Sequence, residues 1–215
     1  MATTITGTSV TSDGLVTNTL GTSNLRLGVN AGDSITSGGN YNTVVGDEAG
    51  TAITTGDGNT AVGYAALDAN TTANDNTAVG YSALTANTTG TRNTAVGESA
   101  LVSNTTGVYN SATGYRTLYY NTTADSNTGY GMQALYQNTT GASNTAVGES
   151  ALYNNTTAAN NTAVGQASLA NNTTGANNVA VGKAALYANT TGADNTAVGY
   201  DSLGANTTGG QNTAI

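Results

Sequence analysis

Apolar and polar positions recur along this chain with a fixed 17-residue period. Residues 59–63 read Asn-Thr-Ala-Val-Gly, and the same five letters return at 76–80 and at 93–97. Because so short a unit cannot bury a core alone, the period predicts stacked copies of one small coil. The asparagine that opens each copy falls at Asn59, Asn76, Asn93, Asn110, Asn127, Asn144, Asn161, Asn178 and Asn195, and a truncated copy starts at Asn212.

The consensus coil reads Asn-Thr-Ala-Val-Gly-x-x-Ala-Leu-x-x-Asn-Thr-Thr-Gly-x-x. Valines such as Val62 and leucines such as Leu67 give two larger apolar positions per coil, which we expect in the core. Thr and Val favour strands, and the Gly that follows Val suits a bend with positive φ or a close backbone approach. Frequent Gly and Asn exclude a helix. We therefore predict an all-β, parallel β-solenoid (β-roll) of about eleven coils, each with two or three very short strands.

Stacking sets each residue above its counterpart one strand spacing away, about 4.8 Å. The opening asparagines then form a ladder of side-chain amides that hydrogen-bond from coil to coil. Charged residues avoid the Asn-Thr-Ala-Val-Gly columns from residue 42 onward, and we place them at solvated corners.

The repeat sets the domain boundaries. We assign 24–215 to the solenoid, with one 18-residue coil at 24–41 and 17-residue coils from 42. In the first two coils Gly32 and Gly50 stand where Leu is expected, and Ile35 and Ile53 stand where Asn is expected. Residues 1–23 lie outside the repeat and are interpreted as an N-terminal cap or attachment segment.

One Val and one Leu per coil make a thin core, which favours oligomerisation. We expect a parallel homotrimer whose Ala or Val faces meet on a common axis, forming a rod on the order of 50 Å long. The last copy ends after four residues, at Ile215, and leaves an open coil edge. We expect such an edge to be covered by a further domain or by another subunit of a particle or filament.

Composition excludes several classes of function. The chain has only 4 Lys+Arg against 12 Asp+Glu, for a net charge of −8, so we expect neither nucleic-acid binding nor attraction to an anionic membrane. It has no Cys and no His, which removes the usual nucleophiles, bases and thiolate ligands. We expect no enzymatic activity and no cofactor. Neither a secretory signal nor an apolar run long enough to span a membrane is visible.

The Asn-Thr-Ala-Val-Gly motif followed by Ala-Leu resembles the head repeats of trimeric autotransporter adhesins and the repeats of bacteriophage tail-fibre and other virion proteins. The resemblance covers residues 24–215. It implies a left-handed, trimeric β-roll used for projection or host attachment. Because the chain as given lacks the secretion signal of such adhesins, we favour a phage fibre assembled in the host cytosol and carried on the virion. A bacterial surface adhesin or self-assembling extracellular filament is the alternative.

Tyrosine is the only aromatic residue, and several tyrosines gather where the consensus breaks down, near Gly129. Exposed tyrosines beside an arginine are common at sites that contact sugars or proteins, so this segment is a candidate receptor site, although the same rings could instead cover apolar surface. The candidate residues are Tyr109, Tyr115, Arg116, Tyr119, Tyr120, Tyr130 and Tyr136.

Three other patterns in the sequence also have plainer interpretations. The second asparagine column, which includes Asn70 and Asn121, forms Asn-Thr-Thr sequons, but a turn and ladder element dictated by the coil is favoured. Asn and Thr two apart on a flat solenoid could form an ice-binding lattice, our third hypothesis for function. Residues such as Asp75 and Asp125 could suggest calcium, but no calcium-loop motif is present, and we expect no metal site.

Overall fold

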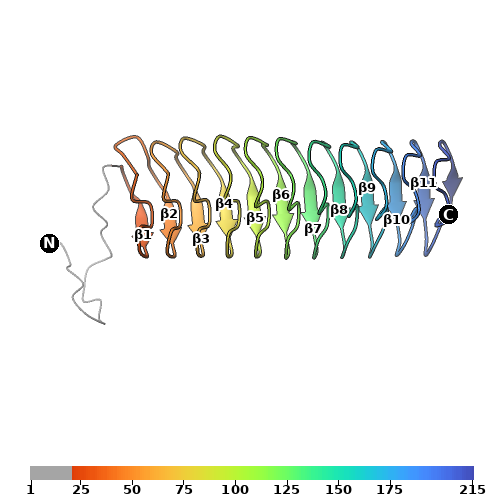
Figure 1. The fold of residues 1–215 in the computed structure, drawn as a ribbon, viewed down its shortest axis with the longest axis horizontal. Helices are drawn as coiled ribbons and strands as arrows, with labels where there is room; N and C mark the ends of the chain where they lie inside the picture. Colours follow the sequence, from red (N-terminus) through yellow and green to blue (C-terminus); the bar gives the residue numbers. More distant parts are fainter. Residues whose placement is uncertain (1–20) are drawn as a thin grey trace.

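Each coil contributes one short strand to one parallel sheet in the computed structural model, which describes residues 21–215 (Figure 1). The sheet has 12 strands that follow one another in chain order along the axis of a rod. Their bounds are β1 (Leu25–Leu27), β2 (Thr43–Val45), β3 (Thr60–Val62), β4 (Thr77–Val79), β5 (Thr94–Val96), β6 (Ser111–Thr113), β7 (Thr128–Tyr130), β8 (Thr145–Val147), β9 (Thr162–Val164), β10 (Val179–Val181), β11 (Thr196–Val198) and β12 (Thr213–Ala214).

The register of the sheet follows the sequence period. Thr60 lies beside Thr77, which lies beside Thr94, so identical residues stack in columns. Only the step from β1 to β2 is longer, because Leu25 pairs with Thr43 across the 18-residue coil. The predicted parallel β-solenoid is confirmed. Of the predicted N-terminal cap at 1–23, only 21–23 belong to the described residues, and the Tyr41 amide donates to the Thr22 carbonyl oxygen there.

The prediction of two or three strands per coil is wrong, because each coil has a single strand of three residues or fewer. The rest of the coil consists of turns and bends. Within the coil that starts at Asn76, Ser82, Leu84 and Arg92 have φ angles of 52°, 54° and 59°, in the left-handed region. Such residues reverse the chain direction locally, so an extended strand cannot continue through them.

The predicted core is wrong for valine. In each consensus strand the central alanine is fully buried, whereas the valine beside it faces outward, and Val147 and Val198 are each 36% exposed. The interior is instead lined by two alanines and one leucine per coil, such as Ala78, Ala83 and Leu84. The perimeter of so short a coil leaves room across the interior only for small side chains opposite the leucine.

The glycine after each strand makes a tight bend, as predicted. Gly97 has a φ of 130°, and a Cβ atom added there would lie 2.5 Å from the carbonyl oxygen of Gly114 in the next coil. No side chain fits such a gap, so the stacking distance itself requires glycine. The bend turns the chain from the sheet toward the buried leucine.

Two columns of buried asparagines also line the interior. In the predicted ladder, the backbone N–H of Asn76 donates to Asn59 Oδ1 at 3.0 Å, and Asn76 Nδ2 donates to the same oxygen at 3.3 Å. In the second column, Asn87 Nδ2 donates to Asn70 Oδ1 at 3.1 Å. Both columns also bond within the coil, because Asn76 Nδ2 and Asn87 Nδ2 donate to the same Gly90 carbonyl oxygen at 2.9 and 2.8 Å. The predicted amide ladder is therefore present, and it is doubled.

The N-terminal end of the interior is closed by an arginine. Arg26 takes the central position in β1, where later strands have alanine, valine or, in β7, glycine. Its guanidinium donates to the Ala31 carbonyl oxygen and pairs with Asp33. A charged group at this position is tolerated because it is paired with Asp33 and its side chain keeps 23% of its surface exposed.

Candidate functional site

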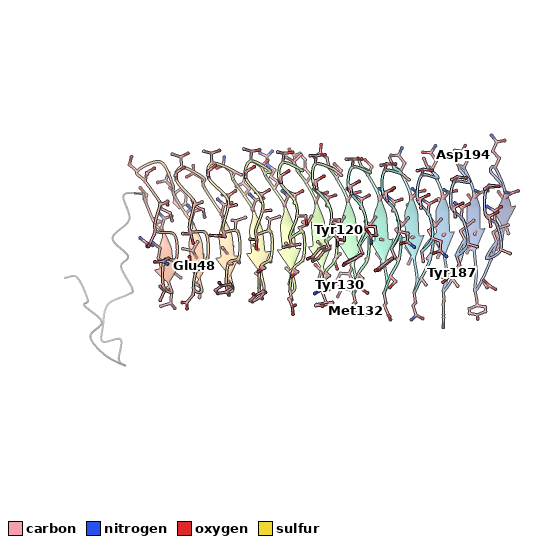
Figure 2. The ribbon with its side chains drawn as sticks, in the orientation of Figure 1. Glu48, Tyr120, Tyr130, Met132, Tyr187 and Asp194 are labelled. Atoms are coloured by element: carbon pink, nitrogen blue, oxygen red, sulfur yellow. The ribbon has the colours of Figure 1, made fainter. Side chains whose placement is uncertain are left out.

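The candidate receptor residues divide into one cluster and two isolated tyrosines. The cluster consists of Tyr115, Arg116, Tyr119, Tyr120 and Tyr136, and we call it the tyrosine cluster. Its members come from the turns that follow β6 and β7, on either side of the buried Leu118 and Leu135. Because these leucines are anchored in the core, the residues directly after them project outward, and Tyr120 is 41% exposed. Figure 2 shows Tyr120 on the side of the rod, between its two edges.

The tyrosine rings of the cluster stack along the rod. Tyr119 and Tyr136 occupy the same position in adjacent coils, with ring centroids 5.3 Å apart and planes at 30°. Tyr120 meets both rings edge-on, with centroids 4.8 Å from Tyr119 and 5.3 Å from Tyr136. Stacked and T-shaped pairs at these distances are favourable, so the cluster forms an ordered aromatic surface.

Arg116 lies between Tyr115 and the stacked rings of the cluster. Its guanidinium carbon lies 4.9 Å from the Tyr115 ring centroid and 5.6 Å from that of Tyr119. Both distances are within the range of a cation–π interaction. Arg116 Nε is buried and has no hydrogen-bond partner among residues 21–215. The rings therefore hold the one cationic group of this surface in place.

The other two predicted residues lie away from the cluster. Tyr109 is the last residue of its coil, directly before Asn110, where Arg92 Nη1 donates to its hydroxyl at 2.6 Å and the Arg92 guanidinium lies 5.5 Å from its ring centroid. Tyr130 is the last residue of β7, and its ring faces outward from the sheet with 61% exposure. In Figure 2, Tyr130 lies toward the edge that carries Met132, and Asp194 marks the other edge.

Two tyrosines that the sequence interpretation missed occupy the same coil position as Tyr119 and Tyr136. Tyr153 follows Tyr136 in the next coil, with ring centroids 5.0 Å apart and planes at 14°. Tyr187 holds the same position two coils further on. We call Tyr119, Tyr136, Tyr153 and Tyr187 the tyrosine column. Their separation by one or two repeat periods was the signal that could have identified them.

The cluster raises the pKa of one of its hydroxyls. A side-chain hydrogen bond with Tyr136 raises the pKa of Tyr120 above its ordinary value, and the neighbouring phenols add to this effect. Negative charge on one phenol disfavours negative charge on the next. Tyr120 therefore keeps its proton, and its ability to donate a hydrogen bond, to a higher pH than an isolated tyrosine.

The asparagine columns are not available as a surface site. Asn70, Asn87 and Asn121 are fully buried, and their amide nitrogens donate to carbonyl groups inside the coil. This supports the turn-and-ladder interpretation of the Asn-Thr-Thr sequons. It also removes the asparagines from the polar lattice that an ice-binding face would need. The threonine after most of these asparagines bonds along the rod, as Thr105 Oγ1 donates to the Thr122 carbonyl oxygen at 3.1 Å.

Neither a metal centre nor a membrane-spanning helix is found among residues 21–215. No group of three or more His, Cys, Asp or Glu side chains in that range could hold a metal ion. The same range contains no helix with the length and hydropathy needed to cross a membrane.

No protein-family model, no curated protein and no solved structure matches the chain.

Proposed function

We propose that this chain is the rod of a bacteriophage fibre, which projects from the virion and presents the tyrosine cluster to a host surface. The observation that carries the proposal is the unbroken sheet from β1 to β12, in which each strand pairs in parallel with the one before it. Such an array gives length and stiffness, because each coil contacts only its neighbours along one axis. The resemblance of the repeat to phage fibre repeats supports the assignment to a virion.

The rod further presents a surface suited to self-association. Along the outer face of the sheet run two columns without a charged residue from β2 to β12, one mainly of Thr and one mainly of Val. Val147, Val181 and Val198 are each 36% exposed on this face. The alanines are fully buried inside the coils and cannot reach another chain. We therefore place the contacts of the homotrimer on the Thr and Val columns, together with the exposed Tyr130.

The oligomeric state tests this part of the proposal. Sedimentation equilibrium of the purified chain is expected to give three times the chain mass of 21.1 kDa. Val164→Asp places a charge within the outer face, and we expect it to reduce the mass to that of one chain. Thr174→Asp adds the same charge at an exposed position outside the sheet and is expected to leave the trimer intact. A wild-type chain that sediments as a monomer contradicts the trimer.

Immunogold labelling distinguishes a virion fibre from a surface adhesin. An antibody raised against the purified rod is applied to purified virus particles and to intact cells of the source culture. We expect label on the projections of the particles. Label confined to the cell envelope would overturn the virion assignment in favour of the adhesin.

A further inference from the structure

The tyrosine column is interrupted at one coil. Tyr119, Tyr136 and Tyr153 follow one another in adjacent coils, the next coil has Ala170 at this position, and the column resumes with Tyr187. The backbone continues through the interruption without change, since the Asn154 N–H donates to the Ala170 carbonyl oxygen at 2.9 Å and the Asn171 N–H donates to that of Tyr187 at 3.3 Å. The coil at Ala170 therefore lacks only the ring.

The missing ring leaves an open cavity of about 340 Å³. Tyr153 and Tyr187 line its two ends along the rod axis, and Ala167 and Ala170 form part of its floor. Ala170 is only 7% exposed and lies at the bottom of the cavity, whereas Tyr187 is 45% exposed and projects beside it. The cavity is therefore a slot between two aromatic walls. Figure 2 shows Tyr187 on the side of the rod, several coils from Tyr120.

The slot spans two coil spacings, or roughly 9.6 Å between the positions of Tyr153 and Tyr187. Carbon atoms in contact lie about 3.5–4.0 Å apart, so a flat ring between two walls occupies about 7–8 Å. A puckered ring, whose carbons lie in two layers, occupies roughly 8–9 Å. The spacing therefore leaves room for a chair-shaped ring with CH groups on both faces. A flat ring also fits when it stacks as Tyr136 and Tyr153 do, with ring centroids 5.0 Å apart, so the polar groups of the slot must distinguish the two kinds of ligand.

The polar side chains of the slot are neutral amides and a hydroxyl. Asn154 Nδ2 donates to Asn171 Oδ1 at 3.1 Å, which orients both amides. Asn154 Oδ1, Asn171 Nδ2 and the Ser150 hydroxyl have no partner among the residues that the structure describes, so they can accept from and donate to ligand hydroxyls. No charged residue lines the slot, and the chain has a net charge of −8, so an acidic ligand is disfavoured.

We propose that this slot binds a neutral hexopyranose ring, with its CH faces against Tyr153 and Tyr187 and its hydroxyls bonded to Asn154, Asn171 and Ser150. Aromatic walls with a few oriented polar groups are the usual composition of a small-ligand site. The proposal deepens the proposed attachment function, and rests on it, by naming the class of ligand on the host surface. The binding test uses the purified chain with simple sugars, so its failure leaves the labelling result for the virion fibre unaffected.

Saturation-transfer NMR of the wild-type chain tests the slot, with the methyl β-glycosides of glucose, galactose and N-acetylglucosamine as probes and p-cresol as the flat aromatic probe. We expect transfer to the ring CH protons of at least one glycoside. Ala170→Tyr completes the column and fills the slot, and it is expected to weaken binding at least ten-fold while circular dichroism and the melting temperature show an intact fold. Tyr187→Ala removes one wall and is expected to weaken binding roughly three- to ten-fold.

Val102→Tyr is the matched control. It adds a tyrosine at the same coil position beside Tyr119, several coils away from the slot, and is expected to leave glycoside binding unchanged. Absence of transfer to all three glycosides would overturn the proposal, as would equal transfer with Ala170→Tyr. Stronger binding of p-cresol than of every glycoside would also overturn it, because the slot would then fit an aromatic side chain of a partner protein.

Discussion

The first two coils and the later coils fill the same interior in different ways. In the later coils Leu84 supplies the large apolar side chain and Asn87 joins the second amide column. In the second coil Gly50 takes the place of the leucine, and Ile53, at the asparagine position, fills the space. Both coils stack in the same register on the same sheet. One large apolar side chain per coil is therefore required, but it can enter the interior from either of two positions.

The backbone explains why glycine accompanies the isoleucine. Gly50 and Leu84 share the left-handed conformation, with φ angles of 55° and 54°. A Cβ atom added at Gly50 would lie 2.7 Å from Ile53 Cδ1 and 2.8 Å from Val44 Cγ1, so there is no room for both side chains. A non-glycine residue in this conformation costs roughly 1–2 kcal/mol. The later coils accept that cost at the leucine. The position that isoleucine occupies in the first two coils can then hold an asparagine of the second amide ladder.

The largest expected effect comes from mixing the two arrangements in one coil. Asn87→Ile, with Leu84 retained, overfills the interior, removes one of the two acceptors of Asn104 Nδ2 and removes the donor to Asn70 Oδ1. Overpacking costs about 1–3 kcal/mol, and each unsatisfied buried polar group costs about 1–3 kcal/mol. Urea unfolding followed by circular dichroism is expected to show a loss of at least about 3 kcal/mol. Thr89→Ile, at an exposed position of the same coil, is the control, and an equal loss there would contradict the explanation.

The next prediction converts a later coil to the arrangement of the first two. Leu84→Gly alone leaves a cavity, and Asn87→Ile alone overpacks, but the double substitution recreates the Gly and Ile pair. We expect the two changes to compensate by about 2 kcal/mol in a double-mutant cycle, within the range seen for residues in contact. Additive losses would mean that the second amide column, rather than apolar volume, decides the stability of this coil.

A similar exchange of volume occurs between adjacent coils at the break in the consensus. Thr117 replaces an alanine, and a Cβ atom added at Gly129 would lie 2.5 Å from its Cγ2. We expect Gly129→Ala to destabilise the chain by about 1–2 kcal/mol through overpacking. Adding Thr117→Ala restores the consensus pair and should recover most of this loss. The melting temperatures of the single and double variants measure the recovery, and no recovery would show that the clash is not the cause.

The smallest expected effect concerns the threonines that directly follow the second asparagine column, which we call the outer threonines. Thr105→Val removes the hydroxyl that donates to the Thr122 carbonyl oxygen at 3.1 Å. That oxygen still accepts from the Thr105 N–H at 2.8 Å, so no buried group is left without a partner. The expected loss is about 0.5 kcal/mol, well below that for Asn87→Ile. A loss of similar size to that of Asn87→Ile would mean that the outer threonines stabilise the stack as strongly as the buried asparagines.

The candidate site was predicted in part. The excess of tyrosine near Gly129 indicated the tyrosine cluster, but a list of neighbours in the sequence could not separate Tyr109 and Tyr130 from it. Each tyrosine points in the direction set by its position in the coil, so Tyr119 and Tyr136, one repeat apart, come closer than their sequence separation suggests. Tyr153 and Tyr187 also point in the direction set by their coil position. The slot between them exists because Ala170 stands where the column would otherwise have a tyrosine.

The sequence by itself determined the period, the parallel register, the glycine bends and the amide ladder, because each depends on what a residue meets one coil away and identical coils meet identical residues. The tertiary structure alone decided which side of each strand faces inward. Hydrophobicity favours Val62 over Ala61 for the core, but the interior enclosed by so short a coil is too narrow for valine opposite leucine, so alanine is buried and valine faces outward. The same narrowness limits each coil to one strand, because the tight turns around Leu67 leave no extended segment there.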